Sequence, residues 1–418
     1  MPARDAETRL TGEYLLARFQ ALDAFLTEHQ GLWQPRPFTH LQLPWEARHP
    51  ELAQWLRRRS LAEAESSHNQ PHTLPAPAPF PQLAAQSRTL SAVDNLPTAA
   101  LAPAPPRLNV DVPGRKWQQI EAFGAALQFA DSSTHWLDWC AGKGHLGRRL
   151  LQPGQQLTCL EYDPALIAAG MALSKHHRLP TSHCQQDVMA EDAALQLNRK
   201  HTPVALHACG DLHVRLMQLA STAGCNQMAV APCCYNRISA EQYQPLSDPA
   251  RRSALRLSVE ELGLPLSETV TAGARVRQQR DISMARRLGF DQLQRQLRGR
   301  DDYLPTPSLP SSWLGKPFAD YCQELAALKG LSTGEQDWTT LETQGWQRLA
   351  EVRNLELVRG LFRRPLEMWL VLDLALFLAQ NGYSVQVGRF CETALTPRNL
   401  MVLAERDLGA DFPAAACG

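Results

Sequence analysis

The sequence lacks an excess of charge of either sign and lacks a long uninterrupted apolar run. Its 418 residues contain 42 Lys and Arg against 42 Asp and Glu, so the formal net charge is zero. Any contact with a polyanion must therefore come from a local patch of basic residues. The most apolar stretch, 365–383, is interrupted by Glu367 and Asp373 and is short for a bilayer span. We expect a buried helix there and no membrane partner.

The ten cysteines show no regular spacing of the kind that marks a disulfide framework. In a chain of this length they indicate reduced thiols. The first residues, "MPARDAETRL", are polar and do not resemble a secretory signal. A cytoplasmic location is therefore the expectation.

The first part of the chain divides by composition. Residues 1–65 are predicted to be helical, because apolar side chains recur at spacings of three and four in "YLLARFQALDAFLTEH". Residues 66–110 are rich in Pro and Ala. Proline interrupts helices and central strands, so this segment is predicted to be a linker.

Strands and helices alternate in the next part of the chain, the predicted core 111–245. The strand candidates are "HWLDW", "QLTCLEY", "SHCQQD", "PVALHAC" and "QMAVAPC". This alternation predicts a parallel, doubly wound α/β sheet. Residues 246–350 are predicted to be an Arg-rich, mainly helical insertion. Residues 351–418 would return as a helix and two antiparallel strands, which completes a seven-stranded Rossmann-like sheet of the methyltransferase type.

A glycine-rich loop follows the first strand of this core. Gly142, Gly144 and Gly147 match G-x-G-x-x-G, a spacing that permits a tight turn and close approach to a ligand. The pattern alone is weak, since dinucleotide enzymes share it. Cys140 stands where such loops often have their first glycine, and we interpret it as a small residue tolerated at the turn.

Acidic residues end three successive strands and sharpen the prediction. Asp138 would repel a pyrophosphate but suits the ammonium group of S-adenosylmethionine (SAM), Glu161 suits its ribose hydroxyls, and Asp187 suits its adenine. The joint order predicts SAM as cofactor. The candidate cofactor-binding residues are Asp138, Cys140, Gly142, Lys143, Gly144, Glu161, Asp187 and His207.

Thiols gather at the ends of the fourth and fifth strands, in "LHACGDL" and "APCCYN". Three roles stay open: a thiolate nucleophile that adds to a pyrimidine, ligands of a zinc ion together with His207, or small packing groups. Adjacent cysteines rarely both ligate one tetrahedral ion, so no metal is predicted. The candidate catalytic residues are His207, Cys209, Asp211, Cys233, Cys234 and Tyr235.

These motifs resemble a family of SAM-dependent methyltransferases. The family includes the methyltransferase half of the animal glutathione S-transferase C-terminal domain-containing protein and bacterial methyltransferase relatives. The resemblance covers about 115–245, through "DWCAGKGHLG", "HACGDL" and "PCCYN", and extends to "TPRN" at 396–399. It implies SAM binding and leaves the methyl acceptor open.

An arginine-rich segment, 275–300, suggests the acceptor. Its arginines are Arg275, Arg277, Arg280, Arg286, Arg287, Arg295, Arg298 and Arg300. Such a segment can hold an RNA backbone, so RNA is the expected acceptor, although Arg-rich helix faces are also common without a ligand. The alternatives are a protein or small-molecule methyltransferase, a nucleotide-binding oxidoreductase, and a SAM-binding module without turnover.

Overall fold

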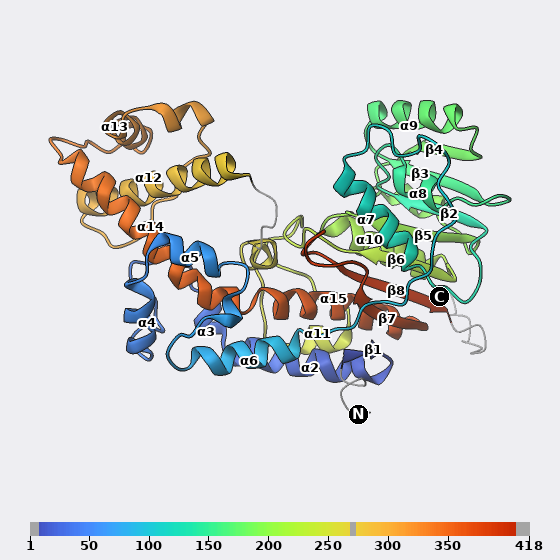
Figure 1. Cartoon of the computed structure of the whole chain (residues 1–418), viewed down its shortest axis with the longest axis horizontal. Coiled ribbons are helices and arrows are strands. Elements are labelled where there is room, and N and C mark those ends of the chain that lie inside the picture. The colour runs from blue at the N-terminus through green and yellow to red at the C-terminus, as the bar shows by residue number, and fades with distance from the viewer. Residues whose placement is uncertain (1–7, 268–272, 407–418) are drawn as a thin grey trace. The chain divides into compact units, whose positions relative to one another are not determined.

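The computed structural model of the chain describes residues 8–267 and 273–406 and divides into two compact units (Figure 1). Unit 1 contains the chain up to residue 27, residues 90–267 and the chain from 364 onward. Unit 2 contains residues 28–89 and the segment that ends at 363. Both units are thus assembled from segments that are far apart in the sequence.

Unit 1 is built on one eight-stranded sheet with the order β1-β7-β8-β6-β5-β2-β3-β4. The strands are β1 (Leu10–Thr11), β2 (His135–Trp139), β3 (Gln156–Glu161), β4 (Thr181–Gln185), β5 (His201–Leu206), β6 (Gln227–Ala231), β7 (Tyr383–Arg389) and β8 (Leu400–Arg406). The strands from β2 to β6 pair in parallel, whereas β8 pairs antiparallel with both β6 and β7. The predicted Rossmann-like methyltransferase sheet is confirmed. The additional strand, β1, has two residues and is too short for any periodicity to reveal.

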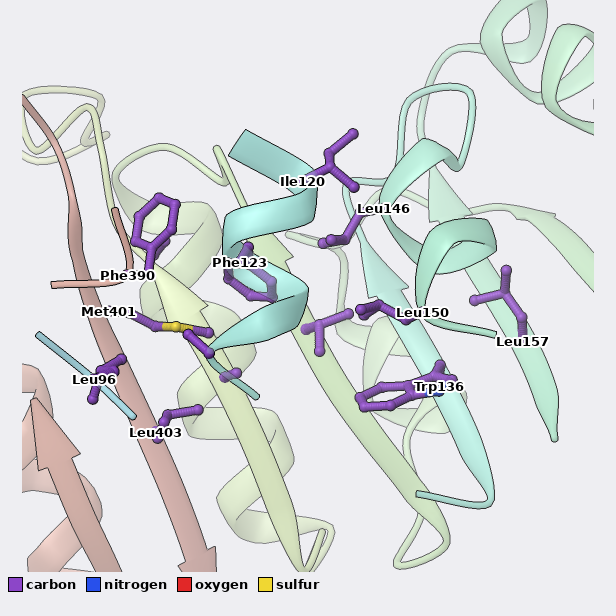
Figure 2. Close-up of a cluster of buried hydrophobic side chains, with 14 of the residues drawn as sticks. Leu96, Ile120, Phe123, Trp136, Leu146, Leu150, Leu157, Phe390, Met401 and Leu403 are labelled. Atoms are coloured by element: carbon purple, nitrogen blue, oxygen red, sulfur yellow. The ribbon is translucent and has the colours of Figure 1, made fainter. Parts of the chain in front are cut away.

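Helices cover the sheet of unit 1. They are α2 (Glu13–Glu28), α7 (Gly114–Ala125), α8 (His145–Leu150), α9 (Pro164–His176), α10 (Asp211–Thr222), α11 (Asp248–Arg252) and α15 (Arg363–Gln380), with 3-10 turns at Glu191–Gln196 and Glu261–Ser267. Figure 2 shows Phe123 of α7 and Leu146 and Leu150 of α8 over the strands, and all three are buried. Burying each such side chain stabilises the fold by about 1.5–3 kcal/mol.

Unit 2 is helical. Its helices are α3 (Gln30–Trp33), α4 (Pro50–Arg57), α5 (Leu61–Ser67), α6 (Phe80–Leu90), α12 (Ala274–Arg298), α13 (Phe318–Leu328) and α14 (Trp338–Gly360). Helix α14 packs against α12, α4 and α5. Arg57 links α4 to α14, because its guanidinium lies 2.6 Å from Glu351 of α14. The same guanidinium lies 2.7 Å from Glu46.

The prediction of a linker across 66–110 is wrong for part of that segment. Helix α6 lies inside it, and Phe80 and Leu83 of this helix are buried. The proline within α6, Pro81, stands in the first helical turn, where no backbone N–H is needed for a helical hydrogen bond. The predicted limit between insertion and core at 350 also differs from the unit boundary, which lies after residue 363.

The apolar helix predicted over 365–381 is α15. Its acids Glu367 and Asp373 are buried in unit 1, at 3% and 0% exposure. Among the helices of the described ranges, none is long and apolar enough to cross a membrane.

Candidate functional site

The loop after β2 leaves the strand through an unusual backbone. Cys140, Gly142 and Gly144 have φ values of 55°, 58° and 74°, all in the left-handed region. A Cβ atom added to Gly142 would meet no described atom within 4 Å, so space lies open beside this loop. The Lys143 carbonyl accepts a hydrogen bond from Arg148 Nη1 at 2.5 Å and ties the loop to α8. The loop is therefore fixed in shape and has room for a ligand.

Asp138 lies buried beneath the loop, with 2% of its surface exposed. Its Oδ2 accepts a hydrogen bond from the Gly147 amide at 2.9 Å. Burial raises the pKa of this carboxyl to about 6, and the Gly147 amide, Arg148 and Lys116 oppose that shift. A Cβ on Gly147 would lie 2.5 Å from a terminal methyl of Leu157, so a larger residue here would require the Leu157 side chain to shift. Asp138 consequently sits at the junction of β2 and the start of α8.

Glu161 ends β3 beside the same loop. Its Oε2 accepts a hydrogen bond from the Gly142 amide at 2.8 Å, and its Oε1 accepts from the amides of Tyr162 and Asp163. These three amides hold the carboxylate in one orientation. A carboxylate has about four lone-pair positions, so one remains for a ribose hydroxyl.

Two exposed side chains at this edge of the sheet escaped the sequence analysis. Tyr162 follows Glu161 directly and is 69% exposed, and Met189, in the turn after β4, is 43% exposed. The predicted adenine contact, Asp187, is exposed and accepts a hydrogen bond from the Met189 amide at 2.9 Å. An aromatic ring and a thioether next to a carboxylate suit the faces and edge of a planar base. Tyr162 could have been predicted as a site residue, because it directly follows Glu161, the predicted ribose acceptor.

The predicted site residues converge on Cys140. The pKa of this thiol is raised to about 12, mainly by burial. The charges of Glu161, Asp138, Cys209 and Asp187 contribute to the same shift. Groups from four neighbouring strand ends thus act on one side chain. Cys140 stays a neutral thiol at pH 7.

His207 follows β5 and has a left-handed backbone, with φ of 71°. Its Nε2 lies 2.7 Å from Gln119 Oε1, and the Gln119 amide nitrogen donates to the Leu395 carbonyl. That second bond fixes which end of the amide is oxygen, so Nε2 of His207 carries the proton and Nδ1 holds a lone pair. Burial lowers the pKa of His207, as do Lys116 and Arg398, which leaves the ring neutral at pH 7. Gln119, on α7, was not predicted from the sequence.

The three predicted thiols come together at the ends of β5 and β6. Cys209 Sγ lies 3.2 Å from Cys233 Sγ, and the sulfurs of Cys209, Cys233 and Cys234 all lie within 4.8 Å of one another. Hydrogen bonding from Cys233 lowers the pKa of Cys209 to about 6, against the effect of burial. The same contact raises the pKa of Cys233. The contact between the two thiols thus favours one shared proton.

Asp211 and Tyr235 have hydrogen-bond partners outside the thiol group. Asp211 Oδ2 accepts hydrogen bonds from the Ser239 amide at 2.7 Å and hydroxyl at 2.9 Å. Tyr235 is 3% exposed, and its hydroxyl donates to Glu367 Oε1 of α15 at 3.3 Å. Both side chains hold the segment after β6 in place, whereas the sequence had suggested them as acid–base candidates.

The residues at the carboxyl ends of β2 to β5 fit SAM. Open space lies beside a left-handed glycine loop, and acids from β2 and β3 flank it. Residues 115–241 match the family model of a methyltransferase domain, and that family uses SAM as methyl donor. No curated protein matches the chain. The match covers strands β2 to β6 and every predicted site residue, so the chain contains a methyltransferase domain, and SAM dependence follows from the family of that domain.

Proposed function

We propose that this methyltransferase acts on RNA, with tRNA or rRNA as the acceptor class. The observation that carries the proposal is a set of cations around the end of the site that holds the thiols. Lys116 and Arg398 both lower the pKa of His207, and Arg237 lowers that of Cys209. These residues come from α7, from the segment before β8 and from the segment after β6. Positive charge from three sides suits an acceptor that carries phosphates.

Roles for the cofactor residues form part of this proposal. SAM supplies an electrophilic methyl group on a sulfonium. Asp138 would pair with the ammonium group of the cofactor, Glu161 with its ribose, and Asp187 with its adenine. Lys143 and the loop glycines would provide backbone contacts.

His207 would serve as the base that removes the acceptor proton. Its neutral ring carries a lone pair on Nδ1, because Nε2 donates to Gln119. Cys209 lies two residues after His207, and Cys233 and Cys234 follow the neighbouring strand β6. Asp211 and Tyr235 would act as positioning residues.

The proposed RNA contact in the segment 275–300 narrows to the start of α12. Arg286, Arg287, Arg295 and Arg298 donate hydrogen bonds within unit 2 and thus have structural partners. Arg275 is exposed. We propose it as the RNA contact of that helix.

A cytoplasmic location and the relationship to the methyltransferase half of the glutathione S-transferase C-terminal domain-containing protein also belong to the proposal. The location is supported by the cysteines of the described ranges, which are free thiols as expected in a reducing compartment.

The test compares RNA nucleosides by mass spectrometry between cells with and without the gene. We expect one methylated nucleoside to disappear, and purified protein with SAM to restore it on RNA from the cells that lack the gene. The double variant Lys116→Glu/Arg237→Glu should bind this RNA at least about tenfold more weakly, with the salt slope reduced by about 2.

The matched control is Arg199→Glu/Lys200→Glu. Both residues are exposed and precede β5, so they lie at the opposite edge of the sheet from the site. The control should bind RNA like the wild type. An unchanged RNA nucleoside profile, with methyl transfer to protein instead, would overturn the RNA proposal and leave SAM binding intact.

A further inference from the structure

The thiol cluster, defined as Cys209, Cys233 and Cys234, has the spacing of a metal site. Zinc bound to thiolates at about 2.3 Å in a tetrahedron requires sulfurs about 3.8 Å apart. The sulfurs of Cys209 and Cys233 are 3.2 Å apart, and all three sulfurs lie within 4.8 Å of one another. Changes of at most about 1 Å in these separations bring all three into position. In the described ranges, no other group of His, Cys, Asp and Glu offers three ligand atoms this close together.

The local backbone explains how two adjacent cysteines reach one point. Neighbouring side chains of a strand point to opposite faces of the sheet. Strand β6 ends at Ala231, however, so Cys233 and Cys234 lie in irregular chain beyond it. The Arg237 amide donates to the Cys234 carbonyl at 3.2 Å and closes a turn that begins at Cys234. The objection to adjacent cysteine ligands does not apply to this conformation.

Contacts around the cluster hold the two thiol-bearing segments together. The Asp211 amide donates to the Arg237 carbonyl at 3.0 Å, and Ser239 donates twice to the Asp211 carboxylate. A Cβ on Gly210 would lie 1.8 Å from the Arg237 carbonyl oxygen, so glycine is required for this approach. The cluster is thus arranged in advance by its surroundings, as metal sites require.

Charge also suits a divalent cation. Three thiolates and one Zn²⁺ leave a single negative charge. Arg237 acts on Cys209 and Arg398 acts on Cys234, so cations adjoin that charge. Metal binding would release the protons of the thiols.

We propose that Cys209, Cys233 and Cys234 bind a zinc ion through three thiolates, with the fourth position left for water or an acceptor atom. Such an open position is typical of zinc sites that polarise a bound oxygen or nitrogen. The site would lie at the strand ends next to His207. This inference concerns the metal alone and does not depend on the nature of the methyl acceptor.

The test uses the full chain, purified under reducing conditions and stripped with a chelator. Titration with Co²⁺ should produce thiolate-to-cobalt charge-transfer absorption and tetrahedral visible bands at about one ion per chain, and Zn²⁺ should displace them. Cys209→Ser, Cys233→Ser and Cys234→Ser should each lose most of this absorption. Cys184→Ser removes a half-buried thiol of β4 outside the cluster and should behave like the wild type.

A second measurement covers the case in which a serine variant folds poorly. Wild-type protein is alkylated with iodoacetamide with and without Zn²⁺ and is then analysed by mass spectrometry. Zn²⁺ should protect the three cluster cysteines and leave the labelling of Cys184 unchanged. Absence of the cobalt bands in the reduced wild type, or equal labelling with and without Zn²⁺, would overturn the proposal. Neither readout uses SAM or RNA.

Discussion

Asp138 combines a buried position with a proposed ionic contact. Its pKa of about 6 in the protein without SAM means that the carboxyl loses its charge as the pH falls through 6. A neutral carboxyl pairs poorly with an ammonium group. We therefore expect SAM affinity to be nearly constant from pH 7 down to about 6 and then to weaken, by at most about tenfold per pH unit. Isothermal titration calorimetry between pH 5 and 7 measures this.

The variant Asp138→Asn provides the control for that profile. Asparagine keeps an oxygen that can accept from the Gly147 amide, but it has no charge to lose. Its SAM affinity should be lower and independent of pH. A wild-type slope that persists in Asp138→Asn would show that another group is responsible.

The same variant should stabilise the fold. An acid with a raised pKa weakens stability above that pKa, and this cost disappears as the pH falls toward its ordinary value of 3.8. At pH 7 the free energy of unfolding of Asp138→Asn should therefore exceed that of the wild type by about 2 kcal/mol, as measured with urea. Equal or lower stability would contradict the burial cost assigned to Asp138.

The sequence predicted the identity of the site acids but not their partners. Asp138, Glu161 and Asp187 stand at strand ends, and strand ends follow from the apolar pattern. Gln119 and Lys116 lie on α7, which precedes the sheet in the chain, and their approach to His207 depends on how α7 packs. No local sequence pattern predicts how α7 packs on the sheet.

Among the elements, α15 shows how buried acids organise a site at a distance. Asp373 accepts hydrogen bonds from the amides of Leu246 and Ser247, at 2.9 and 2.7 Å, and from the Tyr243 hydroxyl at 2.7 Å. Glu367 accepts from Tyr235 in the same way. The segment after β6, which carries two of the clustered thiols, is thereby fastened to α15.

Replacing Asp373 should be costly. Asp373→Ala leaves two buried amides and a buried hydroxyl without an acceptor, and we expect the free energy of unfolding to fall by about 3 kcal/mol or more. Asp373→Asn keeps one oxygen and should lose less. Asp248→Ala removes an exposed acid of the same segment and should change stability by less than about 0.5 kcal/mol. Urea denaturation compares the three variants; similar losses in all of them would refute the role of Asp373.

The elements that sequence analysis found and missed differ in length and in burial. Strands β2, β5 and β6 are mostly buried and β3 is partly buried, and the positions of β2 to β6 were predicted to within about three residues from the alternation of strand and helix patterns. The short β1 lacks enough residues for a pattern. Helix α6 was missed because its proline was counted as a breaker, although prolines are tolerated in a first turn.

At the scale of the whole molecule, the contacts of two arginines in unit 2 give them a structural role. Arg286 donates to the Trp313 carbonyl at 3.1 Å, and Arg287 donates to Thr306 and Pro307. All of these contacts lie within unit 2. Arg286→Glu/Arg287→Glu should therefore lower the stability of unit 2 by about 2–3 kcal/mol and leave SAM affinity unchanged. Thermal unfolding and calorimetry measure the two effects.

The control is Arg275→Glu, an exposed position in the first turn of the same helix. It should leave stability within about 0.5 kcal/mol of the wild type and weaken RNA binding. If the Arg286/Arg287 variant were as stable as the wild type, the arginines would have no structural role. The sequence alone could not distinguish arginines with structural partners from arginines free to contact RNA. The partners of Arg286 and Arg287 lie in segments whose packing the sequence does not specify.

The order of the strands has a consequence for synthesis on the ribosome. Strand β6 is paired on one side by β5 and on the other by β8, which is the last of the described strands to be made. Between them the ribosome must produce all of α12, α13 and α14. Until β8 emerges, the nascent sheet presents β6 as an open edge with unpaired amides and carbonyls, a surface that invites aggregation. We therefore expect newly made chains to depend on chaperones longer than their parallel core alone would require.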